Sequence, residues 1–194
     1  MNWIGGLLII AATLFTVFAL TPLLNSFSFT NKKIARFGVF ASLSIALGIA
    51  ESFLPDFLLP GMKIGLPNLA ILILLYLNGF FPALVVSLVR VVVVSLLRGS
   101  FLAMGGWMSL AGALASILAM AIIKKAFKSA TPVGVSLIGS VFHVSAQIAV
   151  AVAYIGSAAI LYYLPFMGLL AIVSGLAVGL VDARILKILS RIGN

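Results

Sequence analysis

Long apolar runs, separated by short segments with Gly, Pro and charged residues, occupy almost the whole chain. A first run extends from Trp3 to about Leu24, and six more follow. The six later runs are Ile34–Phe53, Leu66–Phe80, Pro82–Leu97, Phe101–Ile123, Pro132–Ile155 and Pro165–Leu186. A helix of about 20 apolar residues crosses the roughly 30 Å hydrocarbon core of a bilayer, and most runs approach that length. The pattern predicts six or seven membrane-spanning helices, and Thr131-Pro132 is a typical helix start.

The composition supports the same class of protein. Hydrophobic residues make up 64% of the chain and charged residues only 8%, which leaves too little polar surface for a water-soluble globule. Cysteine is absent, and the chain has one His and three acidic residues, so we expect no metal site and no cofactor. We predict an all-α membrane protein, a six-helix transmembrane bundle with one extra N-terminal transmembrane helix.

The basic residues indicate topology rather than nucleic-acid binding. The chain has a formal net charge of +9, with 12 Lys and Arg. Nine of these lie in three alternate connections: Lys32, Lys33 and Arg36; Lys124, Lys125 and Lys128; and Arg184, Lys187 and Arg191. Cytoplasmic loops carry such an excess of Lys and Arg. We therefore predict a multi-pass protein of the cell membrane with its N-terminus outside and its C-terminus in the cytoplasm.

Two segments follow from this topology. Residues 1–33 are expected to form the N-terminal transmembrane helix and a basic linker, and residues 34–194 the six-helix membrane domain. No Lys or Arg precedes the first apolar run and no small-x-small cleavage site follows it, which favours a retained anchor over a cleaved signal peptide.

Three basic residues do not fit the cytoplasmic segments: Lys63, Arg90 and Arg98. Arg90 lies in the middle of a predicted helix, where a guanidinium costs at least about 2.5–3.5 kcal/mol. It must therefore face the bundle interior and have a partner. That partner is either Glu51 or backbone carbonyls in a structural tie, or an anionic ligand, and the sequence leaves both open.

A polar stripe runs along the predicted helix after Pro132. Its members are Ser136, Ser140, His143, Gln147 and Tyr154, which at 100° per residue share one face. The serines alone are typical of hydrogen bonding between packed helices. The two larger polar side chains, one turn apart, favour a binding cavity.

Small residues recur every four positions on two predicted helices. These are Gly38, Ser42, Ala46 and Ala50 on one, and Gly175 and Gly179 on the other. Such series let helices approach closely. Packing within the chain is the commoner use, but the first series could also dock a partner subunit.

Several motifs together resemble one known family. They are Glu51, then Pro-Gly-Met-Lys-Ile-Gly-Leu-Pro-Asn at residues 60–68, Leu88-Val89-Arg90, Ser136 through His143 to Gln147, and Tyr162-Tyr163-Leu164-Pro165. With these motifs, the chain from about Ile34 to Leu189 resembles the Gx transporter family, also described as component I of heptaprenyl diphosphate synthase. Such proteins are similar to the S components of energy-coupling factor transporters, six-helix subunits that capture micronutrients near the outer face.

The resemblance implies a substrate-binding subunit for a small anionic or amphipathic micronutrient, with a transmembrane coupling subunit, two ATPases and membrane lipid as partners. The implied substrate-binding residues are Lys63, Asn68, Arg90, Arg98, His143, Gln147, Tyr162, Tyr163 and Glu51. The implied docking surface is the series Gly38, Ser42, Ala46 and Ala50, which departs from a clean Ala-x-x-x-Ala pattern. The extra N-terminal helix is a second departure.

The residues argue against catalysis by this chain alone. It has no Gly-x-x-x-x-Gly-Lys-Ser/Thr loop for ATP. Its only acids are Glu51, Asp56 and Asp182, too few and too scattered for a two-metal diphosphate site, so we predict no catalytic residues. The alternatives are a non-catalytic membrane accessory subunit of heptaprenyl diphosphate synthase, or a structural scaffold without a ligand.

Overall fold

The computed structural model describes residues 31–53, 63, 65–127 and 129–192, with the side chains of 31–34 and 192 left aside. The predicted helix from Trp3 to Leu24 lies outside the described residues. So do Asp56, Lys128 and residues 60–62 and 64 of the motif at residues 60–68. The chain divides into two compact units, Met1–Arg36 and Phe37–Asn194. The second unit holds nearly all of the described residues. The predicted division after residue 33 stays a prediction.

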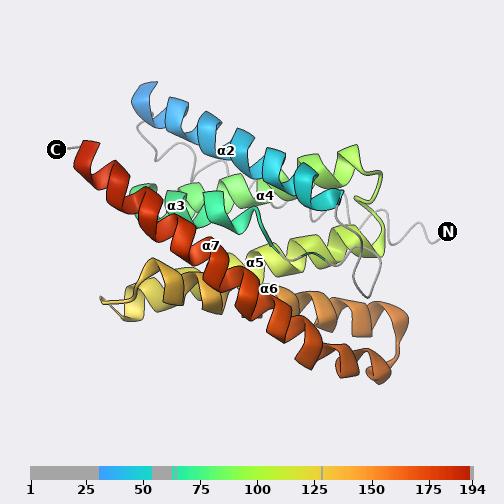
Figure 1. Cartoon of the computed structure of the whole chain (residues 1–194). Helices are drawn as coiled ribbons and strands as arrows, with labels where there is room; N and C mark the ends of the chain where they lie inside the picture. Colours follow the sequence, from blue (N-terminus) through green and yellow to red (C-terminus); the bar gives the residue numbers. More distant parts are fainter. Residues whose placement is uncertain (1–30, 54–62, 64, 128, 193–194) are drawn as a thin grey trace. The chain divides into compact units, whose positions relative to one another are not determined.

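The described residues form six α-helices and one short 3₁₀ helix, with no strand among them (Figure 1). The elements are α2 Asn31–Ser52, α3 Asn68–Asn78, α4 Phe80–Leu97, α5 Met104–Ala126, α6 Pro132–Ile155, η1 Ala158–Tyr163 and α7 Leu164–Ile192. Five spans are long and apolar enough to cross a membrane, while α3 has only 11 residues. The predicted all-α membrane bundle is confirmed, and the chain is a multi-pass helical membrane protein.

Local chemistry sets the helix boundaries. The Thr131 side chain accepts a hydrogen bond from Gly134 N at 3.2 Å, and Pro132 occupies the first turn, so α6 begins as its sequence predicts. The same helix ends at Gly156, whose φ of +72° suits a residue without a Cβ atom. Gly79, with a φ of +91°, separates α3 from α4 in the same way.

Consecutive helices of the second unit run back and forth. In Figure 1 the α3–α4 turn, the α5–α6 connection and the end of α7 lie at the left, and the α4–α5 connection lies at the right. Helices α6 and α7 approach each other closely. A Cβ atom on Gly179 would lie 2.7 Å from Val133 Cα, and one on Gly175 would lie 2.9 Å from Leu137 Cα. This Gly-x-x-x-Gly pair therefore serves packing within the chain.

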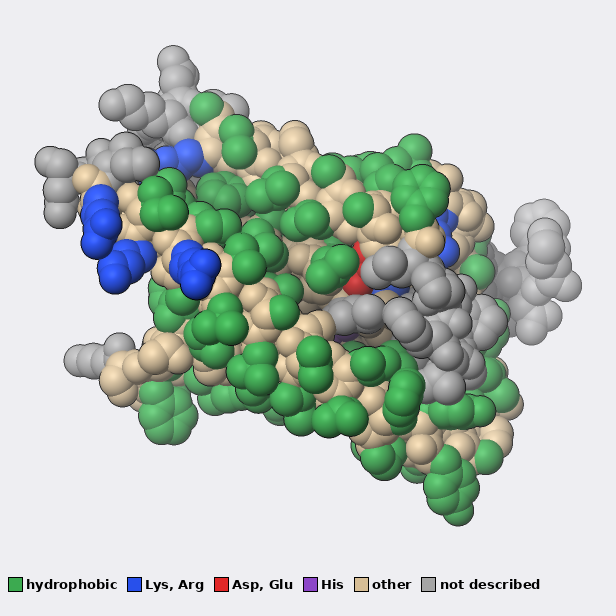
Figure 2. Space-filling view, in the orientation of Figure 1, with side chains coloured by type: hydrophobic (Ala, Val, Ile, Leu, Met, Phe, Trp, Pro, Cys, Tyr) green, Lys and Arg blue, Asp and Glu red, His purple; other side chains and the backbone are tan. Residues whose placement is uncertain are grey.

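The surface is largely apolar, as a bilayer requires. Figure 2 shows hydrophobic side chains over most of one face, with Lys and Arg side chains gathered where α7 ends. Large side chains such as Leu97 and Ile122 are more than half exposed. The small-residue series of α2 is exposed too, at Gly38, Ser42, Ala46 and Ala50. Its role in docking stays a prediction.

One acidic side chain lies inside the bundle. Asp182 of α7 is 0% exposed, and neither of its carboxylate oxygens has a hydrogen-bond partner in the described part of the chain. An ionised carboxylate without a partner costs several kcal/mol at such a position, so the neutral acid is the stable form.

We expect the Asp182→Asn substitution to leave stability unchanged, because the amide has the shape of the neutral acid. The melting temperature in detergent, followed by tryptophan fluorescence, should stay within about 2 °C of the wild-type value, which corresponds to less than about 1 kcal/mol. A fall of more than about 5 °C would mean that the negative charge itself holds the bundle together.

Candidate binding site

A buried group of polar side chains lies where the end of α2 and the start of α3 meet α4 and α6. Its members, which together form the polar cluster, are Glu51, Lys63, Asn68, Arg90, His143 and Gln147. Each is 9% exposed or less, although the residues come from segments far apart in the sequence. The structure thus brings together six of the nine residues that the sequence predicted for substrate binding.

Glu51 holds the turn that leads into α3. Its Oε1 atom accepts hydrogen bonds from the backbone N–H groups of Gly65 and Leu66, the latter at 3.2 Å. Gly65 has a φ of +94°, and a Cβ atom there would lie 3.0 Å from Asn68 Nδ2. The turn therefore depends on glycine both for its backbone conformation and for space.

Gln147 and His143 form the α6 side of the cluster. Gln147 Oε1 accepts a hydrogen bond from Lys63 N at 3.3 Å, and Gln147 Nε2 lies 3.2 Å from His143 Nε2. A backbone N–H can only donate, so the amide nitrogen of Gln147 faces the imidazole, and His143 Nε2 is the acceptor. The proton of the neutral ring is then on Nδ1, which lies against the backbone of Gly112 on α5.

Arg90 presents an unpaired edge inside the bundle. The side chain is 4% exposed, and neither Nε nor Nη2 has a hydrogen-bond partner among the described residues. These two nitrogens share one edge of the guanidinium, the edge that binds a carboxylate or phosphate through two parallel hydrogen bonds. Glu51 Oε2 is also buried and, within the described ranges, unpaired. The two charges attract each other, but these atoms do not bond directly.

The other predicted positions lie outside the polar cluster. Arg98 follows the last turn of α4 and is exposed, Tyr162 is 87% exposed, and Tyr163 is 38% exposed. Within the stripe on α6, Ser136 and Ser140 are buried as predicted, while Tyr154 is 60% exposed.

Helix α5 contributes residues that the sequence reasoning missed. Ser116 Oγ accepts a hydrogen bond from Asn68 Nδ2 at 3.1 Å. A Cβ atom on Gly112 would lie 2.9 Å from His143 Cε1, so this glycine makes room for the imidazole. Together with buried Ser109, these residues repeat at spacings of three and four, a helical-face signal that could have identified them.

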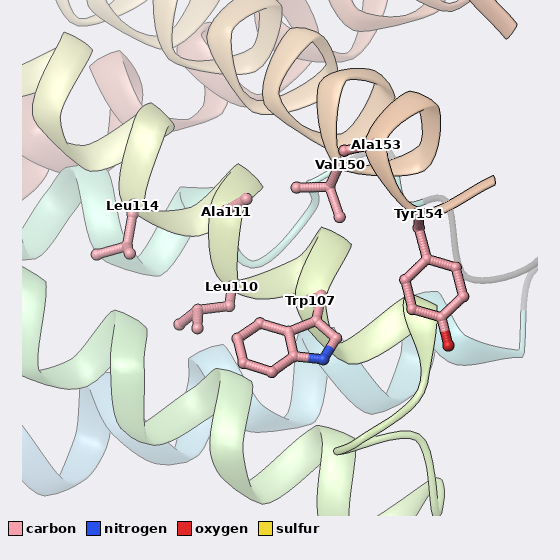
Figure 3. A pocket seen from close by; sticks show the side chains of 7 residues that line it. All are labelled: Trp107, Leu110, Ala111, Leu114, Val150, Ala153 and Tyr154. Carbon is pink, nitrogen blue, oxygen red and sulfur yellow. The ribbon is translucent and has the colours of Figure 1, made fainter. Parts of the chain in front are cut away.

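A small cavity lies beside the cluster. The cavity lined by Gly65, Asn68 and residues of α6 and α7 has a volume of about 10 Å³, enough for one water molecule at most. A larger apolar groove of about 450 Å³ lies between α5 and α6. Figure 3 shows Trp107 of α5 and Tyr154 of α6 toward the same end of this groove, whose other lining residues are aliphatic.

The fold and the cluster define a class: multi-pass helical membrane proteins with a buried, charged polar centre. The family described as heptaprenyl diphosphate synthase component I matches residues 40–185, which is most of the chain. The chain belongs to this family, and the resemblance found in the sequence is confirmed. The description names one component of a synthase and so implies a partner component. No curated protein and no solved structure gives a match.

Proposed function

We propose that this protein is the substrate-binding membrane subunit of an energy-coupling factor type uptake transporter, and that the polar cluster binds a small anionic or amphipathic micronutrient. The supporting observation is that, among the described residues, the Nε and Nη2 edge of Arg90 and the Oε2 atom of Glu51 are both buried and unpaired. Buried polar atoms without partners cost about 1–3 kcal/mol each, and more when charged. A ligand that supplies the missing partners explains why the protein has these polar atoms in its interior.

The unpaired atoms describe the ligand's chemistry. The edge of Arg90 offers two donors to a carboxylate or phosphate, and Glu51 Oε2 accepts a hydrogen bond from a ligand donor such as an amine or a hydroxyl. His143, Lys63, Asn68 and Gln147 are proposed to orient the ligand. Arg98, Tyr162 and Tyr163 lie at exposed positions and are proposed to act at the entrance.

In this proposal, the cluster opens when the ligand enters. The cavity that Gly65 and Asn68 line with α6 and α7 has about 10 Å³ and is too small for any nutrient. Lys63 N donates a hydrogen bond of 3.3 Å to Gln147 of α6, near the long limit for such bonds. In this proposal, the ligand separates these two groups and replaces their hydrogen bond.

The proposed energy source lies outside this chain. A coupling subunit would dock on the exposed small-residue series of α2, Gly38, Ser42, Ala46 and Ala50, and two ATPases would bind that subunit.

A second candidate function is favoured by the family description. Here the protein is a membrane accessory subunit of heptaprenyl diphosphate synthase, and the partner chain performs the chemistry. A non-catalytic role fits the three acidic residues of the chain, because prenyl diphosphate chemistry of the usual kind holds magnesium on aspartate clusters.

The test is purification of the full-length protein from its native membrane in mild detergent, followed by mass spectrometry of the proteins and small molecules that remain bound. The transporter proposal expects a transmembrane coupling subunit, two ATPases and a stoichiometric small anion. The synthase alternative expects a soluble prenyltransferase instead. Ala46→Leu on α2 should release the coupling subunit but keep the anion, and a preparation with neither anion nor ATPases contradicts the transporter proposal.

A further inference from the structure

A second groove of about 450 Å³ lies at the opposite end of α3 from the polar cluster, between the α3–α4 turn and the end of α5. Its lining residues are Leu75, Phe80, Leu118, Ala121, Ile122, Lys124 and Lys125. Of these described lining residues, five are apolar, two are cationic and none is acidic. The groove is therefore an apolar channel with positive charge at one edge.

The position of Lys124 is fixed by contacts. Its Nζ atom donates a hydrogen bond to Leu75 O at 2.7 Å and lies 4.6 Å from the centre of the Tyr76 ring. An ammonium group has three donors, so two remain for a ligand. The neighbouring Lys125 is exposed. A fixed and an exposed ammonium group thus lie next to each other at the end of α5.

The apolar part of the groove faces the membrane. Leu118 is 47% exposed and Ile122 is 62% exposed, on a helix that is long and apolar enough to span the bilayer. The hydrocarbon chain of a lipid that enters this groove exchanges the apolar bilayer for an apolar protein surface. The hydrocarbon chain therefore gives little selectivity between lipids. Selectivity must come from the lysines, which attract anionic headgroups.

We propose that this groove binds an anionic phospholipid, with one hydrocarbon chain between α3–α4 and α5 and the headgroup phosphate at Lys124 and Lys125. The site is separate from the polar cluster and does not depend on the transport proposal. Because each lysine near a membrane surface favours an anionic lipid about fivefold, two lysines should give a preference of about 30-fold over a zwitterionic lipid with identical chains.

The experiment uses the full chain in detergent and native mass spectrometry with equal amounts of phosphatidylglycerol and phosphatidylcholine of the same chain length. We expect retained phosphatidylglycerol to exceed phosphatidylcholine about 30-fold, and the Lys124→Gln/Lys125→Gln variant to lose this preference. The Arg184→Gln/Lys187→Gln variant removes the same charge from α7 and should keep it. Equal retention of both lipids, or an equal loss in both variants, would overturn the proposal.

Two further measurements test whether the groove holds the hydrocarbon chain and whether the lysines hold a lipid rather than a free anion. Ala121→Trp fills the groove but leaves both lysines in place, so it should reduce the amount of retained phosphatidylglycerol if the hydrocarbon chain lies there. Retention that survives Ala121→Trp would contradict the groove. Inorganic phosphate at millimolar concentration should not displace the lipid, and displacement would identify a site for free phosphate instead.

Discussion

The Arg90→Ala variant is expected to fold and insert normally but to lose the small molecule that remains bound to the purified protein. Removing one member of a buried charge pair with hydrogen bonds costs about 2–5 kcal/mol, which corresponds to at least about 30-fold weaker binding. The reason is the unpaired edge of Arg90, whose two donors need an acceptor that no described residue supplies. The measurement is the amount of bound small molecule per protein, released by denaturation and quantified by mass spectrometry.

Two matched variants make this result specific. Arg184→Ala removes the same charge from an exposed position on α7 and should change retention less than about threefold, as exposed charges do. Arg90→Lys keeps the charge but loses the two-donor edge, so it should bind more weakly than wild type and more tightly than Arg90→Ala. If Arg90→Ala lowers the melting temperature and retains the small molecule, Arg90 is a structural tie and the anionic-ligand proposal fails.

The helices and the buried face of α6 could be predicted because they depend on the spacing of apolar and polar residues along the local sequence. Thr131 and Pro132 give the start of α6, and the spacing of His143 and Gln147 places both on its buried face. Tyr154 shares this angle and is nevertheless exposed. It lies in the last turn of α6, beside the groove with Trp107. Helical periodicity predicts the direction in which a side chain points, but not how far along the helix neighbouring helices cover that face.

The hydrogen bonds of the polar cluster could not be predicted in the same way. The sequence offered Glu51 as a direct partner for Arg90, but its Oε1 atom instead binds backbone N–H groups of the turn before α3. Which donor a carboxylate meets depends on tertiary distances of a few ångströms, and residue spacing does not contain them. Gly112 shows the same limit, because its contribution is the space that His143 occupies.

The Gly179→Val variant is expected to destabilise the bundle more than either Arg90→Ala or Asp182→Asn. A Cβ atom on this residue would lie 2.7 Å from Val133 Cα and 3.0 Å from Ser136 Cβ, so α6 and α7 must separate. Backbone atoms cannot rotate away as a side chain can, and helix association in a membrane depends on close packing. We expect a loss of at least about 3 kcal/mol and a melting temperature lower by about 6–12 °C.

Gly168→Val on the same helix is the control for this substitution, because no atom of the described residues lies within 4 Å of a Cβ atom on Gly168. Both variants replace a glycine of α7 with the same valine and so share the same change in helix propensity, and the difference between them reports the α6–α7 contact. Thermal unfolding in detergent measures both, and size-exclusion chromatography shows whether each variant stays monodisperse. Equal melting temperatures would mean that α6 and α7 do not pack through Gly179, and the polar cluster on α6 would then lack the support of α7.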